Sequence, residues 1–345
     1  MRIVSLLASA TEIVDALGAT SQLVGRSHEC DNPPSVRALP ECSSPAFDIH
    51  VSSRAIDTEV NRRLRAGEPL YVIHSALIES LQPDLILTQE HCEVCAVTPA
   101  DLSRSGYDLA QARTVALSAF TLEDIFDNIT RIALALDLTP RGGELVADLR
   151  ARLEAVRQST APLPRPTVAV LEWTDPFFVL GNWGPELVDI AGGEPVLSNR
   201  HAHSVAISPE LLGEADPEYI VIAPCGFTLD RAWQDRAVLE ALPWWPTLRA
   251  VRENKVAFAD GNRLFNRSGI TVADTAELLA EILHRRARAP QPSPIAPSPD
   301  HRPKPSRDSN GAAAHPAHPT PAQTPNPLAE IHDFRWYTEA RVRES

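Results

Sequence analysis

The sequence is poor in features that mark several large classes of protein. It has no run of about 18 apolar residues, so we expect no direct membrane insertion. Aromatic residues make up only 6% of the chain. Basic residues are also too few to balance the acidic ones, which leaves a net charge of −13, carried wholly by residues 1–288. An acidic globular body excludes nucleic acid as the expected partner.

Sequence signatures of common enzymes are also missing. We find no G-x-S-x-G, P-loop, H-E-x-x-H or G-x-G-x-x-G motif, which favours a binding protein over an enzyme. The first residues, "MRIVSLLASATEIV", contain one Arg and a short apolar run. They read as the first strand and helix of the fold, and not as an export leader that would precede the fold. We therefore expect a cytoplasmic protein, periplasmic only if the true start lies upstream. Its five cysteines then favour ligation, redox chemistry or burial over structural disulfides.

Prolines are concentrated at the C-terminal end. Residues 289–345 hold 12 of the 31 prolines and few apolar groups, so we predict a disordered tail. The last stretch, "LAEIHDFRWYTEARVRES", is richer in apolar residues. It leaves two alternatives, a frayed end or a short docking helix.

The rest of the chain alternates strand and helix patterns, which predicts an α/β fold with parallel sheets. A helix is expected over residues 9–18, with Ser9 and Glu12 as its capping box. Helical periodicity then continues from 121 to about 159, capped by Thr121 and Asp124 and jointed near Pro140. The predicted strands have the sequences "RIVSLL", "QLVGRS", "PDLILT", "TVALS", "TVAVLEW", "FFVLG" and "YIVIAP". The predicted organisation is an N-terminal lobe (1–120), a helical backbone (121–160), a C-terminal lobe (161–288) and the tail (289–345).

Ligands of open parallel sheets bind beyond the carboxyl ends of the strands, so the loops after the strands carry the candidate site. If the lobes face each other, these loops line one cleft. The candidates in these loops are Ser9, Thr11, His28, Cys30, Asp31, His91, Cys92, Cys95, Trp173, Asp175, Cys225 and Phe227.

Four segments carry a resemblance to a known family. They are "RIVSLLASATEIVDALGATSQLVGRSHECDNP", "PDLILTQEHCEVCAV", "LEWTDPFFVLGNWGPELVDIAGG" and "DPEYIVIAPCGFTLDRA". Together they resemble bacterial cobalamin-binding proteins of the helical-backbone class of ABC-transporter substrate-binding proteins, from residue 2 to about 285. The resemblance implies two parallel-sheet lobes joined by a long helix. It also implies an inter-lobe cleft for cobalamin, another corrinoid or a similar metal chelate, and an ABC permease as a partner. The turn near Arg267 departs from the family pattern.

The C-x-x-C pair of Cys92 and Cys95 allows three interpretations. With His28 and Cys225 it is a candidate zinc or iron site, because thiolates and imidazole suit these metals. A thiol of lowered pKa at a helix start would instead do redox chemistry. The third interpretation is inert packing of small thiols.

Aromatic residues around Asp175 suit a flat ligand. Trp173 and Trp183 are expected to cover a corrin ring, whose amides donate to Asp175, and the helix end at Ser9 is expected to meet a phosphate. We therefore predict a solute-binding protein. The alternatives are a cytoplasmic thiolate metal-binding or redox protein using Cys92, Cys95 and Cys225, and an interaction module that acts through its C-terminal end.

Overall fold

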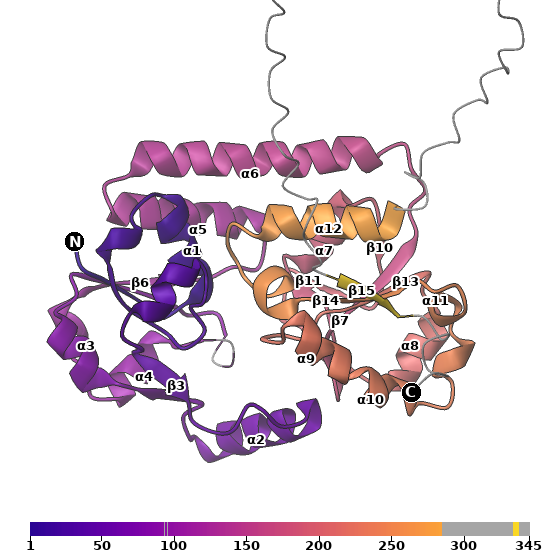
Figure 1. Ribbon diagram of the computed structural model, residues 1–345, viewed down its shortest axis with the longest axis horizontal. Coiled ribbons are helices and arrows are strands. Elements are labelled where there is room, and N and C mark those ends of the chain that lie inside the picture. Colours follow the sequence, from indigo (N-terminus) through magenta and orange to yellow (C-terminus); the bar gives the residue numbers. More distant parts are fainter. Residues whose placement is uncertain (93, 95, 285–333, 338–345) are drawn as a thin grey trace, which may run out of the picture.

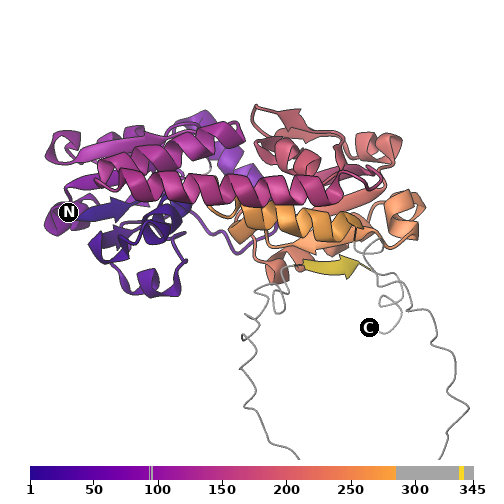
Figure 2. The same cartoon turned by 90° about the horizontal axis from the view of Figure 1, so that it is seen from above.

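The computed structural model describes residues 1–92, 94, 96–284 and 334–337. Most of the predicted disordered tail therefore lies outside the described residues. Two lobes lie side by side along the 22-residue helix α6 (Thr139–Thr160), which crosses both of them (Figures 1 and 2). No described helix combines the length and the apolar character needed to cross a bilayer.

The helical segment is a pair of helices rather than one rod. Helix α5 (Leu122–Ala135) starts at the predicted capping box of Thr121 and Asp124, which is confirmed. The joint follows at Asp137, whose φ is 58°, and Pro140 lies in the first turn of α6. Gly142 lets the pair pack closely, because a Cβ there would lie 2.4 Å from the Cβ of Ala133.

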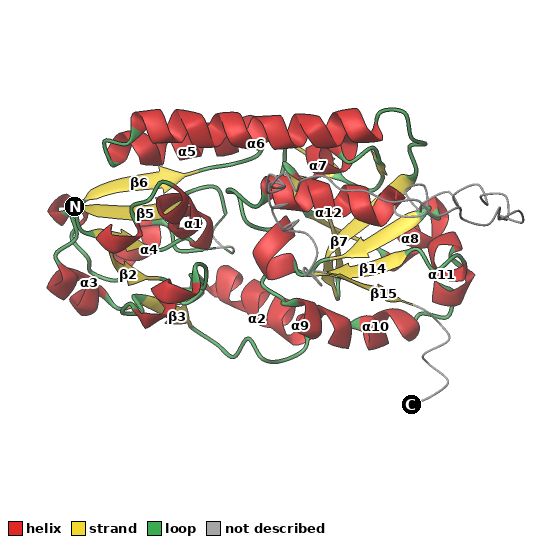
Figure 3. Cartoon of the chain, turned by 45° about the horizontal axis from the view of Figure 1, so that its top comes forward, coloured by secondary structure: helices red, strands yellow, loops and turns green. Residues whose placement is uncertain are grey.

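The N-terminal lobe is built on a four-stranded sheet that is parallel, as predicted (Figure 3). Its strand order is β2-β1-β5-β6. Its strands are β1 (Ile3–Ser5), β2 (Leu23–Arg26), β5 (Leu85–Gln89) and β6 (Arg113–Leu117), and a hairpin adds β3 (Ser43–Pro45) and β4 (Tyr71–Ile73). Its helices are α1 (Ala8–Ala16), α2 (Ser53–Ala66), α3 (Ser75–Leu81) and α4 (Pro99–Arg104). The capping box predicted at Ser9 is wrong, because α1 already starts at Ala8 and Leu7 at its N-cap makes no side-chain cap.

The C-terminal lobe has a mixed sheet in the order β12-β8-β7-β13-β14-β15, with β10 also beside β7. Its centre is parallel, while β8, β12 and β15 run antiparallel to their neighbours. The strands are β7 (Thr167–Thr174), β8 (Phe177–Val179), β10 (Glu194–Pro195), β12 (Val205–Ile207), β13 (Tyr219–Ile222), β14 (Val256–Ala259) and β15 (Phe334–Tyr337); β9 (Gly181–Asn182) and β11 (Asn199–Arg200) pair separately. The helices are α7 (Gly184–Ile190), α8 (Pro209–Ala215), α9 (Leu229–Gln234), α10 (Arg236–Glu240), α11 (Arg249–Arg252) and α12 (Val272–His284).

Strand β15 corrects the prediction for the C-terminal end. Its residues lie inside the expected tail, where we considered a frayed end or a docking helix, yet they form the edge strand of the C-terminal sheet. The exposed Arg335 between the partly buried Phe334 and Trp336 is typical of a strand with one covered face.

One apolar cluster joins the lobes. It runs from Ile3 in the N-terminal sheet through Ile129 and Leu153 of the backbone pair to Val188 and Leu279 of the C-terminal lobe. All five side chains are at most 5% exposed. A continuous core of this kind holds the two sheets in a fixed relation, so the loops at their ends keep their distance.

Candidate functional site between the lobes

Loops from both sheets bring acidic groups together between the lobes. Glu29 follows β2 and Cys92 follows β5, while Glu172 lies near the end of β7 and Cys225 follows β13. Glu29, Glu172 and Cys92 all lie close enough to Cys225 to raise the pKa of its thiol electrostatically. We call these four residues the inter-lobe site.

Burial controls the protonation of the inter-lobe site. It raises the pKa of Glu29 to about 7, although 38% of that side chain is exposed to solvent. It also raises the pKa of Glu172 to about 7. The pKa of the Cys225 thiol is raised by the surrounding protein and the nearby acidic groups, although Cys225 is exposed to solvent. Near neutral pH the two carboxyl groups are therefore partly ionised and Cys225 remains a thiol.

Hydrogen bonds fix the part of the inter-lobe site that belongs to the C-terminal lobe. Ser204 Oγ donates to the Glu172 carboxylate, and the Cys225 backbone N–H donates to the Glu172 carbonyl at 2.9 Å. The positive charge that acts on Glu29 is that of Arg267, and within the described part of the chain no cation contributes to the pKa of Glu172 or Cys225. The described part of the site is therefore rich in acceptors and poor in positive charge.

Three rings from both lobes form a wall beside Cys92. His91 stacks on His203 with ring centroids 6.2 Å apart, and Phe120 meets both edge-on, at 5.7 and 5.1 Å. Burial and the charge of His203 lower the pKa of His91, so its ring is neutral at pH 7. The wall presents flat ring faces.

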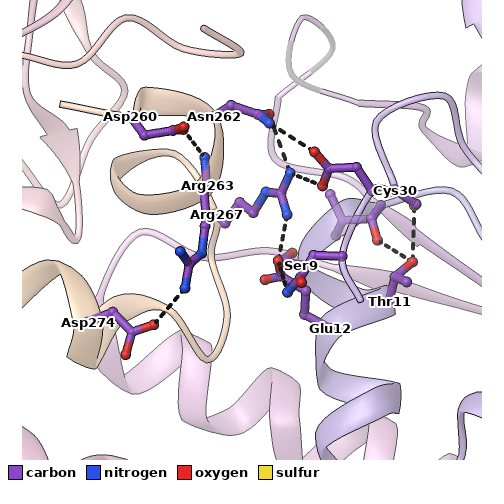
Figure 4. A network of polar contacts seen from close by, with 12 residues as sticks. Ser9, Thr11, Glu12, Cys30, Asp260, Asn262, Arg263, Arg267 and Asp274 are labelled. Atoms are coloured by element: carbon purple, nitrogen blue, oxygen red, sulfur yellow. Dashed lines mark hydrogen bonds and ion pairs between the residues drawn. The ribbon is translucent and has the colours of Figure 1, made fainter. Parts of the chain in front are cut away.

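A second acidic group lies between the lobes and is paired with Arg267 (Figure 4). Arg267 of the C-terminal lobe donates to Glu12 at 2.5 Å and to Asp31 at 2.6 Å. Asn262 donates to Asp31 at 3.2 Å, and Asn32 donates to Glu12 at 3.1 Å. Arg267 and Glu12 are almost completely buried, so this network ties the lobes together rather than binding solute.

Helix α2 covers the predicted aromatic surface. It belongs to the N-terminal lobe and extends toward the C-terminal lobe (Figure 1). Its Ile56 is buried in the core of the C-terminal lobe. Trp173 Nε1 donates to the Ser53 carbonyl at 3.2 Å, and Arg54 forms an ion pair with Asp175. In this conformation Trp173 and Asp175 of the C-terminal lobe therefore bind helix α2 of the N-terminal lobe.

Several predicted contact residues are buried, so their expected role needs correction. Thr11 donates to Cys30 Sγ at 3.0 Å, and both side chains are at most 1% exposed. Ser9 lies against Ser268, their hydroxyls 3.5 Å apart, which closes the start of α1 to a phosphate. Trp183 and Phe227 are 5% and 6% exposed and pack in the two large apolar clusters. Asp31 is bound to Arg267.

The predicted metal site gains no support. Burial lowers the pKa of His28, whose Nδ1 lies 3.1 Å from Ser43 Oγ, and its Nε2 is 4.0 Å from Glu29. Cys92 and Cys225 belong to the inter-lobe site, whereas Cys95 lies outside the described residues. Among the residues that the structure describes, no three His, Cys, Asp or Glu side chains are placed to hold a metal ion.

Sequence reasoning missed Glu29, Glu172, Phe120 and His203. Two of them had a usable signal. Glu172 is the one carboxylate inside a strand of buried residues, and Glu29 stands between two predicted candidates in "SHECD". A carboxylate in such a place calls for a functional explanation because burial of its charge is costly. Phe120 and His203 carried no such mark.

Known proteins share this architecture. The vitamin B12-binding protein of Vibrio vulnificus (strain CMCP6) is 24% identical over 294 residues, which cover 83% of this chain and 92% of the relative. The periplasmic vitamin B12 binding protein of Vibrio cholerae superposes with a TM-score of 0.59 at 21% identity, covering 84% of this chain and 98% of its own. A periplasmic heme binding protein from Pseudomonas aeruginosa gives 0.61 at 23% identity, covering 81% and 91%.

These structures share the two lobes and therefore support the predicted fold class. The model of the family described as "Periplasmic binding protein" matches residues 3–262, about three quarters of the sequence. Its members are substrate-binding proteins rather than enzymes. The chain belongs to the periplasmic binding protein family.

Proposed function

We propose that the inter-lobe site binds cobalamin or a closely related corrinoid as its solute. The observation that carries the proposal is the charge of the site. Glu29 and Glu172 offer carboxyl oxygens from opposite lobes, and the cation that acts on Glu29, Arg267, is already bound by two carboxylates. Such a site favours a ligand that donates hydrogen bonds and carries no net negative charge.

Corrinoids and haem differ in this respect. The rim of a corrin ring carries amide side chains, whose N–H groups donate to carboxylates, whereas haem carries two propionates that would meet Glu29 and Glu172 as like charges. The imidazole and phenyl faces of His91, Phe120 and His203 offer apolar contact for the edge of a flat macrocycle. The names of the Vibrio relatives point to the same ligand class.

An equilibrium titration of the full chain tests this assignment. Cyanocobalamin and haemin are added separately at pH 8, where both carboxyl groups are mostly ionised, and binding is followed by calorimetry. We expect micromolar or tighter binding of cobalamin and at least tenfold weaker binding of haemin. Haemin binding more tightly, or no cobalamin binding at about 100 μM, contradicts the proposal.

Delivery to a transporter is the second part of the proposal. We propose that the loaded protein docks on an ABC permease, as the resemblance implies. Co-purification of a tagged chain from cells grown with and without cobalamin tests it, and recovery of no permease under either condition contradicts it. Fractionation of the same cells tests the expected cytoplasmic location.

A further inference from the structure

The exposed end of the C-terminal sheet is occupied by a segment distant in sequence. Strand β15 pairs antiparallel with β14, with Tyr337 opposite Val256 and Phe334 opposite Ala259 (Figure 2). The chain leaves the sheet region at His284, the end of α12, and residues 285–333 separate it from β15. Strand β15 is therefore added to the edge of the C-terminal sheet by a segment that is separated from the end of α12 by 49 residues.

The two faces of β15 match the surface on which it lies. On one face, Phe334 and Trp336 are opposite the small residues Ala259 and Ala257, and the two rings pack edge-on at 5.6 Å. Large side chains thus fill the space that the alanines leave. Both aromatic residues pack against the apolar cluster that joins the lobes.

The other face has a polar and an apolar anchor. Tyr337 is 5% exposed and its ring meets Trp245 edge-on at 6.2 Å. Arg335 pairs with Asp230 at 2.5 Å and lies over the ring of Trp233 at 6.0 Å. Backbone pairing, alternate pockets and one charge pair are the recognition elements of a peptide added to a sheet edge.

We propose that the edge of β14 is a peptide-docking surface for an aromatic–arginine–aromatic–aromatic strand, and that residues 334–337 are its tethered, exchangeable occupant. Four residues make few contacts, so the covalent connection supplies much of the occupancy. A covalent connection acts as an effective concentration, against which a free peptide must compete. Docking also shields the unpaired backbone groups of β14.

Peptide exchange on the full chain tests the proposal. The double variant Trp336→Ala/Tyr337→Ala empties the edge and leaves the acceptor residues intact. A labelled peptide of residues 330–341 should bind this variant with a Kd below a millimolar, and should bind the unmodified chain at least tenfold more weakly. Hydrogen exchange of the β14 amides should rise in the variant and fall again when the peptide is added.

Charge exchange provides the specificity control. A peptide carrying Arg335→Asp should bind the double variant a few-fold more weakly, and Asp230→Arg in the protein should restore its binding. The proposal is overturned if a scrambled peptide binds equally well or if β14 exchange is the same with and without the aromatic pair. A dimer that disappears in the double variant would also overturn it, because the occupant would then come from a second copy.

Discussion

Two groups of carboxylates lie between the same two lobes and differ in one respect. Glu12 and Asp31 share the guanidinium of Arg267, whereas Glu29 and Glu172 both lie near Cys225 and form no ion pair with an arginine or lysine of the described residues. Burial raises the pKa of Glu12 as well, but Arg267 opposes that rise. The group paired with Arg267 stabilises the arrangement of the lobes, and we propose that the uncompensated group supplies acceptors for a solute.

Removing the guanidinium of Arg267 should abolish its ion pairs with Glu12 and Asp31. Arg267→Ala leaves the Glu12 carboxylate buried without its ion pair, and we expect a loss of about 3–5 kcal/mol in the free energy of unfolding. Denaturant unfolding at pH 7 measures it. The double variant Glu12→Gln/Arg267→Met removes both charges and should lose clearly less. Equal losses would show that the ion pair is not what matters.

The packing of helix α2 on the C-terminal lobe should make a smaller contribution to stability than the ion pairs of Arg267, and it can be measured separately. Ile56→Ala removes an apolar side chain from the C-terminal core and should cost about 2–4 kcal/mol. Leu64→Ala is the matched control, since Leu64 is on the same helix but 41% exposed, and it should change stability by less than about 0.5 kcal/mol. Denaturant unfolding with limited proteolysis at residues 46–70 measures both. Similar values for the two variants would contradict the packing of α2 on the C-terminal lobe.

The uncompensated group predicts a pH effect of the opposite sign from that of an ordinary ion pair. The pKa of Glu172 rises from about 4.5 unfolded to about 7 folded, so the folded state binds the proton more tightly. Stability should therefore fall as pH rises from about 4.5 to about 7, on the order of 1–3 kcal/mol for this group.

The variant Glu172→Gln tests this by removing the titration. Its unfolding free energy should change less between pH 5 and pH 8 than that of the unmodified chain. A profile that rises with pH equally in both proteins would contradict a buried, uncompensated carboxyl group.

Much of the fold was predictable because its signals are local. A few residues are enough to predict the strands "RIVSLL" and "YIVIAP" and the capping box at Thr121. The parallel direction of the strands follows from their alternation with helices. The site was less predictable because burial depends on distant partners. Trp173 looked like a ring cover, but Ser53 and Ile56, more than 100 residues earlier, cover this part of the lobe. Glu12 was expected to form part of a helix capping box, but its carboxylate is bound by Arg267.

The most direct measurement compares cobalamin affinity at pH 8 between the unmodified chain and the double variant Glu29→Gln/Glu172→Gln. Glutamine keeps the size of each side chain but removes the charge that strengthens hydrogen bonds from ligand amides. We predict at least a tenfold loss of affinity in the variant, with little of that loss at pH 5.5, where both carboxyl groups are largely protonated. Equal affinities at pH 8 would contradict the assignment of these two carboxylates as the solute's acceptors.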